Sequence, residues 1–169
     1  HILRRQAAIL QRASVRPLVL MTPKSLLRNP LVASAPEDFS KGSFETIMSH
    51  PGLGTDKDKV KKVVLCTGKI AIDLADKIHP DEQDWLQVYR IEEIYPFPLE
   101  KLREHFRQFP HLKEVVWVQE EPKNMGAWTF VEPRINEALE DRMEVKYIGR
   151  RRRSSPAEGE PDIHKIEQA

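Results

Sequence analysis

The sequence has few of the residues and patterns that mark several large classes of protein. It contains one cysteine, Cys66, which excludes an intramolecular disulfide framework and a cysteine-based zinc finger. Its apolar runs are only a few residues long, far short of a bilayer span. Lys and Arg number 27 against 26 Asp and Glu, so no overall charge attracts nucleic acid or an anionic membrane. We therefore expect partners that are neither nucleic acids nor membranes.

The length of the chain and its first residues suggest how it is organised. A chain of 169 residues, 40% of them hydrophobic, is large enough to bury one core. Residues 1–10 resemble the middle of a helix and lack a capping residue, so we expect a piece of a longer polypeptide. We predict the end of a preceding domain or a linker helix at 1–13, one domain at 14–150 and a polar tail at 151–169. The scarcity of cysteine favours a reducing compartment, a bacterial-type cytoplasm, with a mitochondrial matrix as the alternative.

Apolar runs alternate with helical patterns along most of the chain. Short apolar or β-branched runs predict strands at 16–23, 62–67, 85–91, 114–119 and 144–148. Apolar residues recur at helical spacing in three further segments, at 70–78, 99–109 and 128–139. Pro133 must kink the last helix or lie in its first turn. The alternation predicts an α/β fold, a three-layer sandwich with a mostly parallel five-stranded sheet.

Two regions have less regular patterns. Residues 34–59 form a long, weakly patterned connection, which is typical of functional, interfacial or mobile segments. The run Arg150–Arg153 is followed by Ser154 and Ser155. Four arginines without interleaved aromatic residues favour a solvated or interface-pairing stretch over a phosphate-binding one.

Charged residues follow the predicted strands at 67–69, 92–96 and 120–126. Ligands of open parallel sheets meet such loops, because they follow the carboxyl ends of the strands. Lys69 lies at a helix start and could hold an anion there, or it could be a solvated lysine. Glu120 and Glu121 are adjacent and point in opposite directions, so they cannot form a catalytic pair. We expect one of these carboxylates to stabilise the next helix or to bond a neighbouring domain.

No pattern in the chain predicts a catalytic, cofactor-binding or metal-ligating residue. The sequence lacks both G-x-x-x-x-G-K-[ST] and G-x-G-x-x-G, which are the common phosphate-binding patterns. Its six histidines show neither H-x-x-x-H nor H-E-x-x-H spacing, and no serine triad can be traced. Cys66 lies inside an apolar strand, so we expect it to be buried and inert. We also expect Trp117 and Trp128 to be buried, since each lies in an apolar pattern.

Five segments resemble, in order, motifs of a single enzyme family. They are MTPKSLLRNP at 21–30, VLCTGK at 64–69, RIEEIYPFP at 90–98, VWVQEEPKNMGAW at 116–128 and YIGRRRRSSPAEG at 147–159. Together they resemble the C-terminal part of the thiamine-diphosphate-dependent first component of 2-oxoglutarate dehydrogenase, the alpha-ketoglutarate dehydrogenase family. The resemblance extends from His1 to about His164.

The resemblance implies a fold, a reaction and partners. The fold is that of a transketolase C-terminal domain. The whole enzyme oxidatively decarboxylates 2-oxoglutarate and transfers succinyl to lipoyl-lysine, with thiamine diphosphate and magnesium bound upstream of this fragment. Its partners are a second subunit in a homodimer, dihydrolipoyl succinyltransferase and dihydrolipoyl dehydrogenase, with acetyl-CoA or a nucleotide as an effector. The fragment alone is expected to be inactive, with a dimer-forming, structural or regulatory role.

Eight residues are the interface or effector candidates under this interpretation. They are Arg28, Lys69, Tyr95, Glu120, Glu121, Asn124, Arg150 and Arg151. Two alternatives remain open. One is another thiamine-dependent relative, such as the decarboxylase or hydroxy-oxoadipate synthase branch, and the other is a free-standing, non-catalytic α/β interaction module. A G-D-G signature in a longer reading frame would exclude the interaction module.

Overall fold

The computed structural model describes residues 19, 21–157, 159–160, 162–163 and 166. The chain divides into two compact units, His1–Glu45 and Thr46–Ala169. The predicted helical pattern at residues 1–10 lies outside the described residues. The predicted domain bounds of 14–150 remain a prediction.

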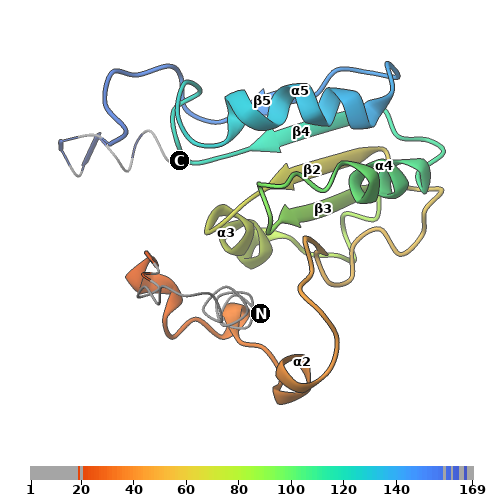
Figure 1. The fold of residues 1–169 in the computed structure, drawn as a ribbon, viewed down its shortest axis with the longest axis horizontal. Helices are drawn as coiled ribbons and strands as arrows, with labels where there is room; N and C mark the ends of the chain where they lie inside the picture. The colour runs from red at the N-terminus through yellow and green to blue at the C-terminus, as the bar shows by residue number, and fades with distance from the viewer. Residues whose placement is uncertain (1–18, 20, 158, 161, 164–165, 167–169) are drawn as a thin grey trace, which may run out of the picture. The chain divides into compact units, whose positions relative to one another are not determined.

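The described part of the first unit contains short elements. Two 3-10 turns, η1 (Lys24–Leu26) and η2 (Pro30–Val32), precede a five-residue helix, α2 (Pro36–Ser40), which is labelled in Figure 1. Asn29 caps η2, because its Oδ1 accepts a hydrogen bond of 2.9 Å from the backbone N–H of Leu31. Pro30 suits the first position of such a turn, where no backbone donor is needed.

The prediction of a buried strand at 16–23 is wrong for its described residues. Val19 and residues 21–23 belong to no strand, and the side chains of Val19 and Met21 are 74% and 92% exposed. The rest of that segment lies outside the described residues. An apolar run becomes a strand only where another strand pairs with its backbone, and Pro23 has no N–H to offer.

The second unit is built on a five-stranded sheet. Its strands are β1 (Ile47–Ser49), β2 (Lys62–Cys66), β3 (Leu86–Ile91), β4 (Glu114–Val118) and β5 (Lys146–Ile148). Their order in the sheet is β1-β3-β2-β4-β5. Strands β2 to β5 run parallel, and β1 pairs antiparallel with β3. The predicted five-stranded, mostly parallel sheet is confirmed, but its edge strand β1 comes from the connection predicted at 34–59.

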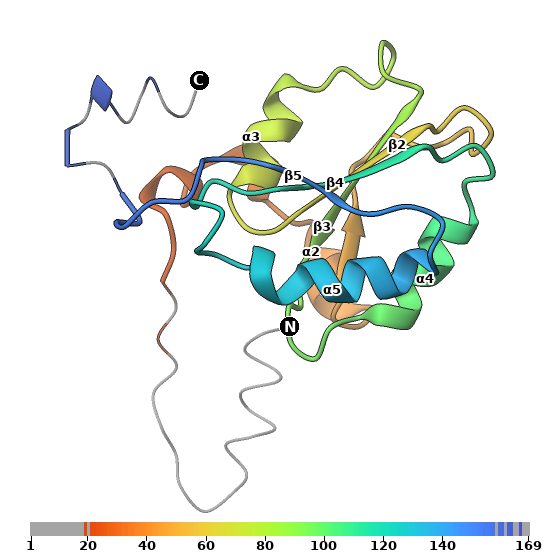
Figure 2. The same ribbon diagram turned by 90° about the horizontal axis from the view of Figure 1, so that it is seen from above.

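Helices cover both faces of this sheet. Figure 2 shows α4 (Leu99–Arg107) and α5 (Trp128–Leu139) on one face and α3 (Ile70–Lys77) on the other. Alternate residues of β2 follow this division, since Leu65 packs in the cluster under α4 and α5 and Cys66 in the cluster under α3. The predicted three-layer sandwich is thus confirmed. Pro133 lies inside α5 and not in its first turn.

The buried core contains the side chains that the apolar patterns predict. Trp117 is 0% exposed and Trp128 is 3% exposed, which confirms that both are buried. Cys66 is fully buried, and burial raises the pKa of its thiol to about 12, since the thiolate loses its solvation. A thiol that stays protonated is a poor nucleophile, so Cys66 acts as an apolar core residue.

Candidate functional site

The direction of the strand connections reverses between β2 and β4. Strand β2 continues through α3 to β3 on one side of it, and its other neighbour β4 continues through α5 to β5 on the opposite side. The loops at their carboxyl ends therefore diverge to opposite faces of the sheet. Ligands of open α/β sheets bind in the crevice at such a reversal. The candidate site consists of loops 67–69 and 119–127, which meet there.

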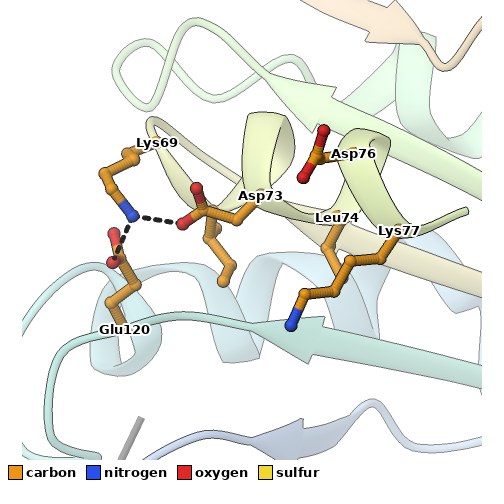
Figure 3. Close-up of a pocket in the computed structure, with 7 residues that line it drawn as sticks. Lys69, Asp73, Leu74, Asp76, Lys77 and Glu120 are labelled. Carbon is orange, nitrogen blue, oxygen red and sulfur yellow. Dashed lines mark hydrogen bonds and ion pairs between the residues drawn. The ribbon is translucent and has the colours of Figure 1, made fainter. Parts of the chain in front are cut away.

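Lys69 bridges the two loops. Figure 3 shows its ammonium between two carboxylates, those of Asp73 on α3 and Glu120 after β4. The Lys69 Nζ lies 3.2 Å from Glu120 Oε1, and Lys69 is the residue just before α3. Burial acts to lower the pKa of Lys69, but its hydrogen bonds to Asp73 and Glu120 outweigh burial, and the pKa is raised. Lys69 therefore links α3 to the loop after β4 through two ion pairs.

A cleft of about 500 Å³ opens beside this bridge. It is lined by Lys69, Ile70, Asp73, Leu74, Asp76, Lys77 and Glu120. The lining carries three carboxylates, two ammonium groups and two apolar side chains. Such a mixture favours hydrogen bonding to a polar group of a partner.

Gln119 organises the loop between β4 and α5. This side chain is only 4% exposed, and its Oε1 accepts hydrogen bonds from the Trp117 indole at 2.9 Å and the Trp128 backbone N–H at 3.1 Å. Its Nε2 donates to three loop carbonyls, those of Glu121 at 3.2 Å, Pro122 at 3.2 Å and Met125 at 2.8 Å. Gln119 thus supplies the hydrogen-bond acceptor for the first backbone N–H of α5, that of Trp128.

The hydrogen bonds of Gln119 bear on the expected role of Glu120 and Glu121, and they explain why residue 126 is a glycine. We expected Glu120 or Glu121 to stabilise the start of the next helix or to bond a neighbouring domain. The first role falls to the neutral amide of Gln119, which binds the helix N–H, while Glu120 pairs with Lys69; the second stays a prediction. Gly126 has φ +64°, and a Cβ there would lie 3.1 Å from the amide atoms of Gln119. Only glycine combines this backbone conformation with room for the Gln119 side chain.

Asn124 fixes the tail to the same loop. Its Nδ2 donates to the carbonyl of Arg153 at 2.8 Å, and the Arg153 backbone N–H donates to Asn124 Oδ1 at 3.0 Å. The backbone N–H of Lys123 also donates to the carbonyl of Arg150 at 3.1 Å. The Arg150 guanidinium donates to the carbonyl of Pro156 at 3.0 Å. Asn124 and Arg150 thus shape the tail, whereas the side chain of Arg151 is exposed.

The third loop places Tyr95 apart from the Lys69 cleft. Its side chain is 80% exposed, and its ring meets that of Phe130 edge-on, with ring centroids 6.3 Å apart. The guanidinium of Arg134 stacks on the Phe130 ring, 3.6 Å from its centroid. Tyr95 is not one of the residues that line the Lys69 cleft. Arg28 is an exposed residue of the first unit.

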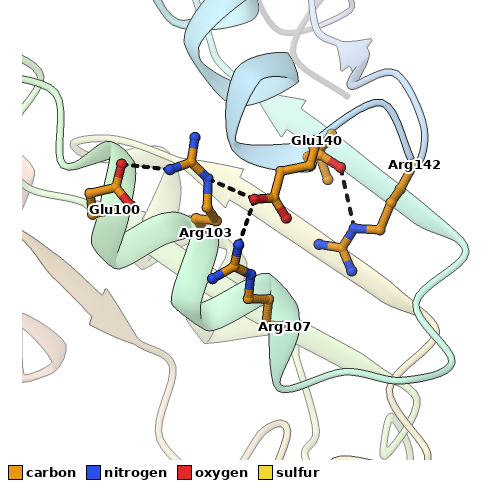
Figure 4. A network of polar contacts seen from close by, with 6 residues as sticks. Glu100, Arg103, Arg107, Glu140 and Arg142 are labelled. Carbon is orange, nitrogen blue, oxygen red and sulfur yellow. Dashed lines mark hydrogen bonds and ion pairs between the residues drawn. The ribbon is translucent and has the colours of Figure 1, made fainter.

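Two arginines of α4 clamp the end of α5, which the sequence analysis missed. Figure 4 shows both Arg103 and Arg107 pointing to the Glu140 carboxylate. Glu140 Oε1 lies 3.2 Å from Arg103 Nε and 2.6 Å from Arg107 Nη2. Glu140 follows α5 with φ 52°, in the left-handed region. The Arg142 Nε donates to the carbonyl of Leu139 at 3.2 Å. Arginines four residues apart lie on the same face of a helix, so one carboxylate can pair with both.

Two further findings concern only the part of the chain that the structure describes. No three or more His, Cys, Asp or Glu side chains lie close enough together there to hold a metal ion. None of its helices is long and apolar enough to cross a membrane.

Comparisons with known proteins agree with the five motifs. The family model described as "2-oxoglutarate dehydrogenase C-terminal" matches residues 33–169. The chain is 58% identical over 169 residues to the "2-oxoglutarate dehydrogenase E1 component" of a Geobacillus species. The aligned residues make up 99% of this chain and 18% of that protein. Proteins of the same name from Exiguobacterium and Shouchella clausii are 55% and 56% identical, over 100% and 99% of this chain and 18% of each relative.

The chain therefore spans about 18% of the length of these relatives. The family match covers the whole α/β unit, and the relatives cover the described part of the first unit as well. This chain belongs to the 2-oxoglutarate dehydrogenase C-terminal family, as part of an E1 component.

Proposed function

We propose that this chain is the C-terminal part of a thiamine-dependent 2-oxoglutarate dehydrogenase E1 component. In full, that enzyme oxidatively decarboxylates 2-oxoglutarate and transfers succinyl to lipoyl-lysine, alongside dihydrolipoyl succinyltransferase and dihydrolipoyl dehydrogenase. The observation that carries this proposal is the identity of 58% to a relative of that name over 99% of the chain. Within the enzyme, the chain has a dimer-forming and structural role.

We place no thiamine diphosphate–magnesium site among the described residues. Magnesium takes oxygen ligands in octahedral geometry, commonly one or two carboxylates with the phosphates. The described residues bring no three potential metal ligands together, and the carboxylates of Asp73 and Glu120 already bind the ammonium of Lys69. We therefore assign thiamine diphosphate and magnesium to the part of the enzyme that precedes this chain, and no catalytic residue to this chain.

The carboxyl edge of the sheet is the surface that we assign to docking. Its loops are held in one conformation by the Lys69 ion pairs and by the five hydrogen bonds of Gln119. A surface that is already ordered loses little conformational entropy on binding, which favours association. We infer that this edge docks against the upstream domains or the second subunit of a homodimer, with exposed Tyr95 and Glu121 at the contact.

The effector that the resemblance implies, acetyl-CoA or a nucleotide, carries phosphates. A phosphate would have to displace a carboxylate to reach Lys69, because Asp73 and Glu120 already bind it. Arg151 is exposed, and its guanidinium offers the planar donor fork that suits phosphate. We therefore assign phosphate contact, if the enzyme has such an effector, to Arg151 in preference to Lys69.

The docking assignment is tested in the full-length enzyme with Lys69→Met. This change removes the ammonium and leaves the carboxylates of Asp73 and Glu120 without their partner. The matched control is Lys77→Met, which removes a charge from the same cleft and leaves the Lys69 ion pairs intact. We expect Lys69→Met to raise the dimer dissociation constant about tenfold in sedimentation, because loops that are no longer held in place must be ordered on binding. A tenfold change corresponds to about 1.4 kcal/mol of binding free energy.

The kinetic outcome separates docking from a role in substrate binding. Docking predicts a lower fraction of active Lys69→Met enzyme with a KM for 2-oxoglutarate that is unchanged within about twofold. An unchanged dimer with a greatly raised KM would place this edge in the substrate site and contradict the proposal. Calorimetric titration of the 169-residue chain with thiamine diphosphate and magnesium should give no binding isotherm, and a micromolar isotherm would contradict the cofactor assignment.

A further inference from the structure

The first 36 residues differ in charge from the rest of the chain. They contain five arginines, one lysine and neither aspartate nor glutamate. The remaining 133 residues contain 21 basic and 26 acidic side chains. A local excess of six positive charges, of which Lys24 and Arg28 lie among residues 19–32, favours contact with a negatively charged partner.

Large apolar side chains are exposed in the described part of this segment. Five of them lie within residues 19–32: Val19, Met21, Leu27, Leu31 and Val32, which are 74%, 92%, 70%, 48% and 42% exposed. Where the structure describes side chains of the first unit, each is exposed or half-buried. The part of the first unit that the structure describes thus contributes no buried side chain to a core. Several large apolar side chains exposed within one short segment favour an interaction surface.

The composition of the segment separates the possible classes of partner. Its first 36 residues contain no Phe, Trp or Tyr on which bases could stack, which disfavours single-stranded nucleic acid. Pro23 and Pro30 interrupt residues 19–32, and the described elements are two three-residue 3-10 turns. A long amphipathic helix, which is a common means of binding a membrane surface, cannot form across them, and this disfavours a membrane partner. The remaining partner is an acidic and apolar protein surface.

We propose that residues 19–32, the basic arm, dock on an acidic, apolar surface of the polypeptide that precedes this chain in the full-length enzyme. The proposal rests on the proposed function. The relatives extend more than five times the length of this chain, since it spans 18% of each, and that length supplies the surface. Leu27 and Leu31 are the apolar anchors, and Lys24 and Arg28 beside them pair with carboxylates of that surface.

Limited trypsin digestion measures whether the arm is covered. Trypsin cleaves after Lys24 and Arg28, both exposed in this chain, and after exposed Lys41, which lies outside the arm and serves as the internal reference. We expect cleavage at Lys24 and Arg28 to be at least about tenfold slower in the full-length enzyme than in the 169-residue chain, because cleavage follows the population of the accessible state. Cleavage at Lys41 should change by less than twofold. Unchanged cleavage at Lys24, or equal protection of Lys41, would overturn the assignment to the arm.

Two variants test the apolar anchors in the full-length enzyme. Leu27→Asp and Leu31→Asp should restore rapid cleavage at Lys24, because each puts a carboxylate where an apolar contact is required. Ile163→Asp is the matched control, an exposed apolar residue outside the arm, and it should leave cleavage unchanged. Protection in all three variants would contradict the role of the leucines.

Other occupants give different results with the 169-residue chain alone. Protection that appears with rising chain concentration, together with a dimer in sedimentation, would indicate a second copy and overturn the proposal. Protection by phosphatidylglycerol vesicles or by a DNA oligonucleotide would likewise overturn it. Decarboxylation of 2-oxoglutarate by the full-length enzyme is assayed in parallel. An inactive enzyme with a protected arm contradicts the proposed function alone, whereas an active enzyme with an accessible arm contradicts this inference alone.

Discussion

Replacing Gln119 with alanine should destabilise the α/β unit more than any change of an exposed polar residue. The amide of Gln119 joins the end of β4, the loop after it and the start of α5 through five hydrogen bonds. Truncation leaves two donors, the Trp117 indole N–H and the Trp128 backbone N–H, without their acceptor. Both donors lie in residues that are at most 3% exposed, so water replaces the lost acceptor poorly.

The expected loss of stability follows from those two donors. A buried donor left without a partner costs about 1–3 kcal/mol, so two cost about 3 kcal/mol when partial access of water at the helix start is allowed for. With a urea dependence of about 2 kcal/mol per molar, the unfolding midpoint should fall by about 1.5 M. Gln119→Met retains the side-chain volume and removes every hydrogen bond, and it should lose a similar amount.

Urea unfolding followed by tryptophan fluorescence measures this change, because Trp117 and Trp128 lie at the site. The control is Gln108→Ala, an exposed glutamine after α4, which should alter the free energy of unfolding by less than about 0.5 kcal/mol. A loss below about 1 kcal/mol in Gln119→Ala would refute the reasoning. A large loss in Gln119→Ala with none in Gln119→Met would attribute the effect to the cavity and not to the hydrogen bonds.

Two further predictions concern the core. Trp117→Ala and Trp128→Ala should each cost about 3–5 kcal/mol through cavity formation, and thermal unfolding within a degree of wild type would show that these rings do not pack in the core. Burial and the nearby charge of Lys101 lower the pKa of His105. The two ring nitrogens of His105 are buried and have no hydrogen-bond partner among the described residues. The unfolded state therefore binds the proton more readily, and stability should fall as pH drops below about 6.5, the usual histidine pKa. His105→Phe should abolish that fall in urea titrations between about pH 7 and 5, whereas His111→Phe at an exposed position should retain it, and an unchanged slope in His105→Phe would contradict the assignment.

Most of the second unit could be predicted from the sequence, because its elements have strong local patterns. Strands β2, β3 and β4 are each apolar on both faces, since helices cover both, and α3, α4 and α5 each have an apolar stripe. Strand β1 has no such pattern. It is three residues long with one buried side chain, Ile47, and it becomes a strand only by pairing with Ile91 and its neighbours.

The candidate site was predictable in its parts but not in its connections. Lys69, Glu120 and Asn124 were identified from the loops at the carboxyl ends of strands, and those loops do meet, because parallel strands end at one edge of the sheet. Which residues pair was not predictable, since Lys69 and Glu120 are 51 positions apart and become neighbours only because β4 lies beside β2. Local periodicity determines that a segment is a strand or a helix. Strand order and the burial of Gln119 depend on the packing of the whole unit, so only the tertiary structure decided them.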